Sequence, residues 1–177
     1  WGMIVDDKYW AAKVGDGFTL KDEAEKYLKV NNLAIEGKPD DLTITTHVCR
    51  GNYHSTFFSS GAYDSVADLL FGEENVNAYY LEYDDKRSGG FAPLAKVSGD
   101  KKVVLGLITT KIPQLEDKGK VIARIHEAEK YVPLDRLYLS PQCGFASCEI
   151  GNKLTEEEQW EKLKLVKEIA EEVWGDR

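Results

Sequence analysis

The stretch Val103-Val-Leu-Gly-Leu-Ile-Thr109 is apolar on both of the faces that a β-strand presents to its surroundings. Such a pattern is typical of a strand buried inside a parallel sheet that helices cover. Three further β-branched or aromatic runs predict strands at residues 42–49, 78–83 and 137–140, the last stopped by Pro141. Because the four strands alternate with helical segments, the sequence indicates right-handed βαβ units in a parallel sheet.

Apolar residues spaced three and four apart predict the helices around these strands. One helix covers residues 62–71, a short one covers 91–97, and a longer one follows Pro113, where a helix can begin. Thr19 with Asp22 has the spacing of a helix N-cap, and Thr155 with Glu158 predicts a capping box. The residues expected to face the core are Val66, Ala67, Leu70 and Phe71 in the first helix, Val121, Ile122, Ile125, Ala128 and Val132 after Pro113, Trp160, Leu163, Val166, Ala170, Val173 and Trp174 in the last helix, and Leu20, Ala24, Tyr27 and Leu28 near Thr19.

Two architectures accommodate four such units, an open doubly wound sheet and part of a (β/α)8 TIM-type barrel. A complete barrel takes about 250 residues, whereas the chain has 177. As a barrel fragment, the single segment 1–177 consists of a helical lead-in over residues 1–40 and four βα units over residues 41–177. Its open edge strands lead us to expect self-association, or a further segment that completes the barrel.

The composition, 42% apolar and 31% charged, is that of one globular domain. The 23 lysine and arginine residues against 31 acidic residues give a net charge of −8, which argues against nucleic acid or an anionic membrane as the main partner. No apolar run approaches the roughly 20 residues of a bilayer span, and we expect no signal peptide. Three cysteines do not make a disulfide framework, so we expect reduced thiols and a cytoplasmic protein.

Residues able to bind a metal follow three of the predicted strands. His47 and Cys49 lie at the end of the first strand, and residues two apart in a strand point to the same face. Glu82 lies near the end of the second strand, and Cys143 follows the fourth. Because the carboxyl ends of parallel strands meet at one edge, where active sites are built, the four groups are expected to converge. An imidazole, two thiols and a carboxylate suit tetrahedral Zn²⁺.

Other interpretations of the same residues stay open. A free cysteine often packs as a small apolar side chain, and a strand glutamate can simply face solvent. A zinc hydrolase or deaminase is a second class, but the deaminase signature of His-x-Glu with Pro-Cys-x-x-Cys is absent. A structural zinc site is a third class; such sites use closely spaced ligand pairs, whereas these donors are spread over roughly a hundred residues.

Three runs of the sequence together resemble the catalytic domain of cobalamin-independent methionine synthases, and most closely the short single-domain bacterial relatives. The runs are Thr46-His-Val-Cys-Arg-Gly-Asn52, Leu81-Glu-Tyr-Asp-Asp85 with Arg87-Ser-Gly, and Leu139-Ser-Pro-Gln-Cys-Gly-Phe145. The resemblance covers nearly the whole chain and implies the C-terminal half of a (β/α)8 barrel. It also implies that the zinc ligands of the family fall on His47, Cys49, Glu82 and Cys143.

The resemblance implies an enzyme of methionine biosynthesis, an S-methyltransferase that moves a methyl group from polyglutamylated 5-methyltetrahydrofolate to homocysteine. Zinc then presents the homocysteine thiol as the reactive thiolate. The larger family members place a histidine after the third strand to protonate the leaving group, but Leu107-Ile-Thr-Thr-Lys-Ile-Pro113 contains none. The alternatives are therefore a family methyltransferase with another donor or thiol acceptor, or an inactive fragment with only a zinc site.

Several other polar residues are weaker candidates. Asp84, beside Asp85 at the same strand end, is the candidate for binding a substrate amine, although both are equally well explained as solvated turn residues. His54 is either a neighbour of the metal ligands or an exposed loop residue, and His126 is expected at the surface. Cys148, five residues after Cys143, is expected to pack rather than to bind the metal.

Overall fold

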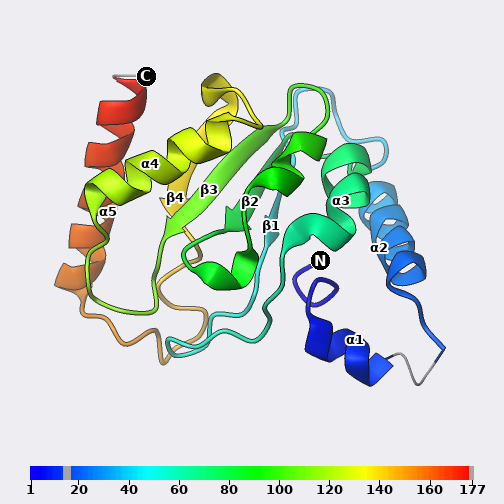
Figure 1. The fold of residues 1–177 in the computed structure, drawn as a ribbon, viewed down its shortest axis with the longest axis horizontal. Coiled ribbons are helices and arrows are strands. Elements are labelled where there is room, and N and C mark those ends of the chain that lie inside the picture. The colour runs from blue at the N-terminus through cyan, green and yellow to red at the C-terminus, as the bar shows by residue number, and fades with distance from the viewer. Residues whose placement is uncertain (14–16, 176–177) are drawn as a thin grey trace.

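A computed structural model describes residues 1–13 and 17–175 of the chain (Figure 1). Its sheet has four strands in chain order, namely β1 (Thr45–Val48), β2 (Ala78–Glu82), β3 (Lys102–Ile108) and β4 (Leu137–Pro141). Each neighbouring pair of strands is parallel, so the predicted βαβ units are confirmed. The fold is α/β, part of a (β/α)8-type arrangement, in which only 3₁₀ turns, Lys86–Ser88 and Ala92–Lys96, connect β2 to β3.

The helices are α1 (Asp7–Lys13), α2 (Leu20–Ala34), α3 (Ala67–Glu73), α4 (Lys118–Glu129) and α5 (Glu156–Trp174). Both predicted caps are present, because Thr19 accepts from the Asp22 N–H and Thr155 forms a capping box with Glu158. The helix expected over residues 62–71 is a 3₁₀ turn, Tyr63–Val66, that continues into α3. The short helix expected over 91–97 is a 3₁₀ turn, Ala92–Lys96.

Two predicted boundaries are wrong. The helix after β3 begins at Lys118 with Asp117 as its N-cap, and not at Pro113. The Asp117 side chain caps the helix by accepting from the Lys120 N–H, and the loop before it is held where Glu116 accepts from the Thr109 N–H at 2.9 Å. Pro141 does not stop β4 but is its last residue, opposite Ile108. Proline is tolerated there because a strand end does not require its missing N–H.

The apolar stripe predicted for α5 is confirmed only in part, since Val166, Val173 and Trp174 pack against the core. The buried line is Lys162, Leu165 and Ile169, whereas Trp160 is 58% exposed. Lys162 is buried because its ammonium donates to the Gln114 carbonyl at 2.7 Å and pairs with Glu116 at 3.1 Å. Because these acceptors lie inside the protein, α5 is oriented with Lys162 at the centre of its inner face. The other residues predicted to face the core from α5 are only half-buried: Leu163, Val166, Ala170, Val173 and Trp174.

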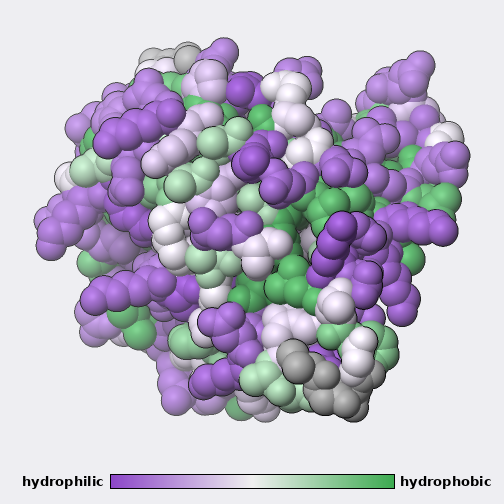
Figure 2. Space-filling view, turned by 45° about the vertical axis from the view of Figure 1, so that its right-hand side comes forward, coloured by the Kyte–Doolittle hydropathy of each residue, from purple (hydrophilic) through white to green (hydrophobic). Residues whose placement is uncertain are grey.

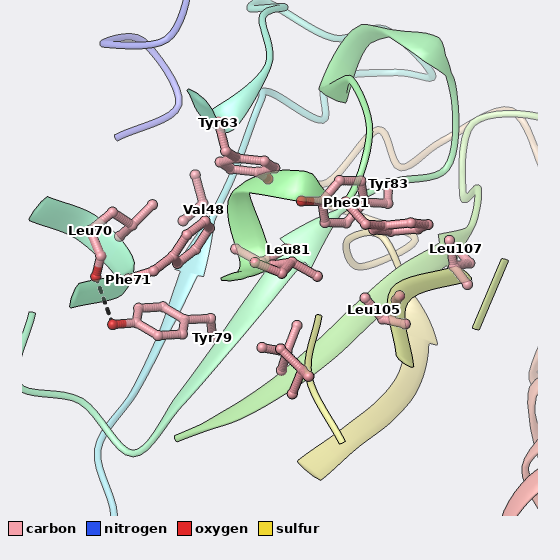
Figure 3. Packing of buried hydrophobic residues seen from close by; sticks show 14 of the residues in the cluster. Val48, Tyr63, Leu70, Phe71, Tyr79, Leu81, Tyr83, Phe91, Leu105 and Leu107 are labelled. Atoms are coloured by element: carbon pink, nitrogen blue, oxygen red, sulfur yellow. Dashed lines mark hydrogen bonds between the residues drawn. The ribbon is translucent and has the colours of Figure 1, made fainter. Parts of the chain in front are cut away.

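The core lies between the sheet and its helices and is rich in aromatic rings (Figure 3). The Tyr83 ring packs against Phe91 and Tyr63, with centroids 4.6 and 5.3 Å apart. The Tyr79 hydroxyl donates to the Leu70 carbonyl at 2.6 Å, which ties β2 to α3. Such aromatic contacts add to the free energy gained by burying apolar area. The core thereby fixes β2, the strand that carries Glu82.

Some apolar side chains remain on the surface. Tyr27, predicted to face the core, is 40% exposed, and its ring centroid lies 6.3 Å from that of Trp1. Val30 and Leu33 of the same helix are also exposed. On the face shown in Figure 2, hydrophilic residues cover most of the surface and apolar residues gather towards its middle. None of the described helices combines the length and the apolar character needed to cross a membrane.

Candidate metal centre

The loops that follow the strands gather at one end of the sheet, the lower end in Figure 1. His47 belongs to β1 and Cys49 follows that strand directly, while Glu82 ends β2 and Cys143 comes two residues after β4. The parallel register sets His47 beside Tyr80 and Glu82 beside Gly106, so the strand ends stay level. One potential ligand atom from each of the four residues lies within 4.8 Å of all the others.

The spacing of these atoms suits a small tetrahedral cation. His47 Nε2 lies 3.7 Å from both the Cys143 sulfur and Glu82 Oε1. Ligands that surround zinc tetrahedrally at 2.0–2.3 Å are roughly 3.3–3.8 Å apart. One nitrogen, two sulfurs and one oxygen are donors that zinc accepts, and the sulfurs exclude magnesium or calcium as the preferred ion. The four residues therefore fit zinc both in chemistry and in spacing.

Glu82 is fully buried, and both of its oxygens are held by hydrogen bonds. Oε1 accepts from the Arg50 backbone N–H at 2.8 Å, and Oε2 accepts from Arg87 Nη2 at 2.7 Å. Arg87 also donates to Asp84 at 2.7 Å and pairs with Asp85, while its guanidinium lies over the Phe57 ring. Burial raises the pKa of Glu82, against the lowering effect of the Arg50 and Arg87 donors. The carboxylate is thus fixed in orientation before any ion binds.

The two thiols of the cluster differ in acidity. Hydrogen bonds from Cys143 and from His47 lower the pKa of Cys49 to about 3. The same contact with Cys49, together with burial, raises the pKa of Cys143. For His47, burial disfavours the imidazolium, but the hydrogen bond and charge of Cys49 and the charge of Glu82 together raise its pKa. Without a metal, the two sulfurs therefore share one proton, which stays on Cys143 and must leave when a cation binds both.

A network of loop residues fixes the segment around Cys143. The Gln142 side chain accepts from the Thr110 N–H at 2.6 Å. The Gly144 carbonyl accepts from Asn52 Nδ2 at 2.7 Å and from the Thr110 hydroxyl at 2.9 Å. Asn152 donates to both Asn52 and the Thr110 carbonyl. Both neighbours of Cys143 are therefore held, by residues that belong to the loops after β1, β3 and β4.

The residues of this network were not identified from the sequence. Asn52, Thr110 and Asn152 are common polar loop residues with no periodic spacing. Arg87 belongs to one of the runs that carry the family resemblance, but nothing in its sequence position predicts its contact with Glu82. The one available signal was position, because each of these residues follows the carboxyl end of a strand, where functional groups gather in parallel α/β folds.

The remaining predicted candidates lie around the cluster. The Asp84 carboxylate is almost fully buried and accepts from Arg87, while Asp85 is half-exposed and caps the turn that contains Arg87. His54 Nδ1 lies 3.1 Å from the Gly151 carbonyl in the loop network, and His126 pairs with Glu129 on the surface of α4. Cys148 is a free, half-buried thiol that does not belong to the four-residue cluster.

Comparisons of the sequence and of the structure with known proteins identify the same family. A family model described as the cobalamin-independent synthase catalytic domain matches residues 12–172. An uncharacterised Bacillus subtilis protein, YxjG, is 49% identical over 182 residues, which cover 97% of this chain and 48% of that protein. A methionine synthase of Pyrococcus abyssi is 23% identical over 71% of the chain and 38% of its own length.

The fold has counterparts among solved structures. The crystal structure of the putative vitamin-B12-independent methionine synthase from Listeria monocytogenes superposes with a TM-score of 0.73 at 38% identity. It covers 99% of this chain, which corresponds to 46% of the Listeria chain. A B12-independent methionine synthase from Shewanella superposes with a TM-score of 0.66 at 23% identity and shares the fold. The chain spans about half the length of the curated Bacillus subtilis relatives YxjG and YxjH that it matches.

Proposed function

Because this chain belongs to the family of cobalamin-independent synthase catalytic domains, we propose that it is a zinc-dependent S-methyltransferase of methionine biosynthesis. The proposed reaction moves a methyl group from 5-methyltetrahydrofolate to the sulfur of homocysteine. The observation that carries the proposal is the convergence of His47, Cys49, Glu82 and Cys143 at the carboxyl ends of three parallel strands.

The four residues would hold zinc through one nitrogen, two sulfurs and one carboxylate oxygen. Zinc bound there supplies a Lewis acid that keeps a thiol in its thiolate form at neutral pH. Two thiolates and a carboxylate donate much negative charge, which favours activation of a thiol substrate over acidification of bound water. This donor set supports methyl transfer to sulfur in preference to hydrolysis.

The chain's own residues prepare this site. Arg50 N–H and Arg87 hold the Glu82 carboxylate in one orientation, so that one oxygen faces His47 at 3.7 Å. Asn52 and Thr110 hold the carbonyl next to Cys143. Partners of this kind around a metal ligand reduce the reorganisation that binding requires. Asp84 is proposed to bind the substrate amine, which requires its carboxylate to be shared between the amine and Arg87.

A second candidate function is methyl transfer within the same family from a different donor or to a different thiol. It is favoured by the loop Leu107–Pro113, which has no histidine to protonate a folate leaving group. A fragment that binds zinc without catalysis is the remaining alternative. We further propose that residues 1–40 are a lead-in to the four βα units of 41–177, that the substrates are small molecules, and that the protein works in the cytoplasm with reduced cysteines.

The test is a methyl-transfer assay with the purified protein, homocysteine and 5-methyltetrahydrofolate, with methionine detected by mass spectrometry. Zinc-loaded protein is expected to form methionine, chelator-treated protein to lose this activity, and added zinc to restore it. Cys143→Ser should lose zinc and activity together, while Cys148→Ser, the matched control outside the cluster, should keep both. Methionine formation by metal-free Cys143→Ser would contradict the zinc-thiolate proposal.

A further inference from the structure

Lys111 is a buried cation that the metal cluster does not account for. It lies in the loop after β3 with only 8% of its surface exposed, and its backbone N–H donates to Thr109 Oγ1 at 3.3 Å. Among the residues that the structure describes, its Nζ has no hydrogen-bond partner. Burying an ammonium without an acceptor is costly, because the group loses its hydration and gains nothing in return. Such a group at an active end of a sheet points to a ligand.

The charged groups that face Lys111 belong to the candidate metal centre. Asp84 and Glu82 attract its ammonium, Arg87 repels it, and the Cys143 sulfur also contributes. Lys111 follows β3, the strand that lies between β2, which carries Glu82, and β4, which leads to Cys143. Burial lowers the pKa of Lys111, and the two carboxylates act in the opposite direction. A lowered pKa makes an ammonium a better proton donor near neutral pH.

Two other buried cations near the cluster, Arg87 and Arg50, contact groups of the protein itself. Arg87 binds the carboxylates of Glu82, Asp84 and Asp85. The Arg50 guanidinium stacks on the Tyr63 ring, 4.4 Å from its centroid. In the described part of the chain, Lys111 Nζ has neither a salt bridge within 4 Å nor an aromatic ring to stack on. Lys111 is thus a buried cation beside the cluster that neither a carboxylate nor an aromatic ring engages, whereas Arg50, whose guanidinium nitrogens also lack hydrogen-bond partners, is covered by the Tyr63 ring.

We propose that Lys111 is a further catalytic residue, which contacts the leaving atom of the methyl donor and transfers a proton to it. This inference rests on the proposed methyl transfer. The homocysteine thiolate forms the new bond to the methyl carbon, and the bond between that carbon and the donor nitrogen breaks. The electron pair stays on the nitrogen, which takes the proton from Nζ. The neutral Lys111 amine then takes a proton from water.

The test compares Lys111→Met and Lys111→Arg with the wild-type protein in the zinc-loaded state. Lys111→Met should lower kcat with 5-methyltetrahydrofolate by about 100-fold or more, the usual contribution of a general acid. Zinc content and the KM for homocysteine should stay unchanged. Lys111→Arg should remain impaired, since arginine keeps the positive charge but does not release a proton. The matched control is Lys101→Met, near the opposite end of β3, whose ammonium donates to the Phe71 carbonyl.

Two measurements separate proton transfer from a structural role. Methylation of bound homocysteine by iodomethane, whose leaving iodide takes no proton, should proceed at the same rate in Lys111→Met and wild type. In protein labelled with ¹⁵N at lysine Nζ, the Lys111 signal, identified by its loss in Lys111→Arg, should shift when tetrahydrofolate is added.

The opposite results overturn the inference. An unchanged kcat in Lys111→Met, full activity in Lys111→Arg, loss of zinc from either variant, slowed methylation by iodomethane or an unmoved Lys111 signal would each reject proton transfer by Lys111. Failure of the proposed function looks different, because zinc-loaded wild type would then form no methionine from 5-methyltetrahydrofolate at all. That result would remove both proposals together.

Discussion

Glu82 has both carboxylate oxygens hydrogen-bonded inside the protein while one of them still faces His47. A buried carboxylate normally requires such partners, because it has lost its hydration. Here the donors come from the loop after β1 and from the turn after β2, so the two loops and the ligand are fixed together. Arg87 is the donor that mutation can test, because its side chain can be replaced, whereas the Arg50 donor is a backbone N–H.

Arg87→Met is therefore expected to weaken zinc binding by about 10–100-fold, the usual effect of removing a partner that orients a metal ligand. The reason is that Glu82 Oε2 would be left buried without its 2.7 Å donor. Competition with a chromophoric chelator measures the affinity. Lys86→Met, at the exposed neighbouring residue, serves as the control. An unchanged affinity in Arg87→Met would show that Arg87 does not orient Glu82.

The acidity of the two thiols gives a prediction for the metal-free protein. With the pKa of Cys49 lowered to about 3, this group is a thiolate throughout pH 5–8, so its alkylation rate by iodoacetamide should be nearly constant over that range. The raised pKa of Cys143 keeps that group protonated, so it should react much more slowly. Peptide mass spectrometry after timed alkylation distinguishes the two. A Cys49 rate that rises tenfold per pH unit would contradict this assignment.

At the residue scale, the sequence predicted the positions of those side chains whose direction is determined by strand geometry. His47 and Cys49 point the same way because they are two apart, and the four candidate ligands meet because parallel strands end at one edge. Their role as metal ligands stays a prediction. The supporting contacts of Asn52 and Asn152 were not predictable, because they join loops 42 to 100 residues apart whose paths depend on tertiary packing. The contact of Arg87 with Glu82 is local in sequence but depends on the path of the turn Lys86–Ser88.

At the scale of elements, Lys162 links α5 to the loop that follows β3. Its ammonium is fully buried and is satisfied by Glu116 and by the Gln114 carbonyl. Glu116 also accepts from the Thr109 N–H, at the start of the loop that contains Lys111. This one ion pair therefore sets both the rotation of the last helix and the path of a loop at the candidate site.

Glu116→Gln should lower the free energy of unfolding by about 3 kcal/mol, because it leaves a buried ammonium without its counter-charge. Glu171→Gln removes the exposed pair between Lys167 and Glu171 on the same helix, and should change stability by less than about 1 kcal/mol. Urea unfolding followed by circular dichroism measures both. Equal, small effects from the two substitutions would mean that the Lys162 pair does not hold α5 in place.

The existence, order and direction of the strands followed from hydrophobic patterning, since a two-sided apolar run such as β3 has few alternatives to a parallel sheet. The helix caps at Thr19 and Thr155 also followed from the sequence, because capping depends on residues three apart. The fully buried line of α5 and the residue at which α4 begins did not follow from the sequence. Both are set by Lys162 and Glu116, a pair 46 residues apart, and pattern rules place lysine at the surface.

At the scale of the whole molecule, β1 and β4 each have one strand neighbour among the described residues. Open strand edges and exposed apolar patches favour association. We therefore expect the 19.9 kDa chain on its own to sediment as a species heavier than a monomer. Sedimentation velocity at several concentrations checks this. A single monomeric species with one cooperative unfolding transition would contradict the expectation.

The central claim is that this end of the sheet holds zinc and presents a thiol to it. X-ray absorption at the zinc edge tests both parts in one measurement, before and after addition of homocysteine. The zinc is expected to have two sulfur ligands at about 2.3 Å with two nitrogen or oxygen ligands at about 2.0–2.2 Å, and one additional sulfur when homocysteine is present. Absence of bound zinc, or a sulfur count that homocysteine leaves unchanged, would contradict it.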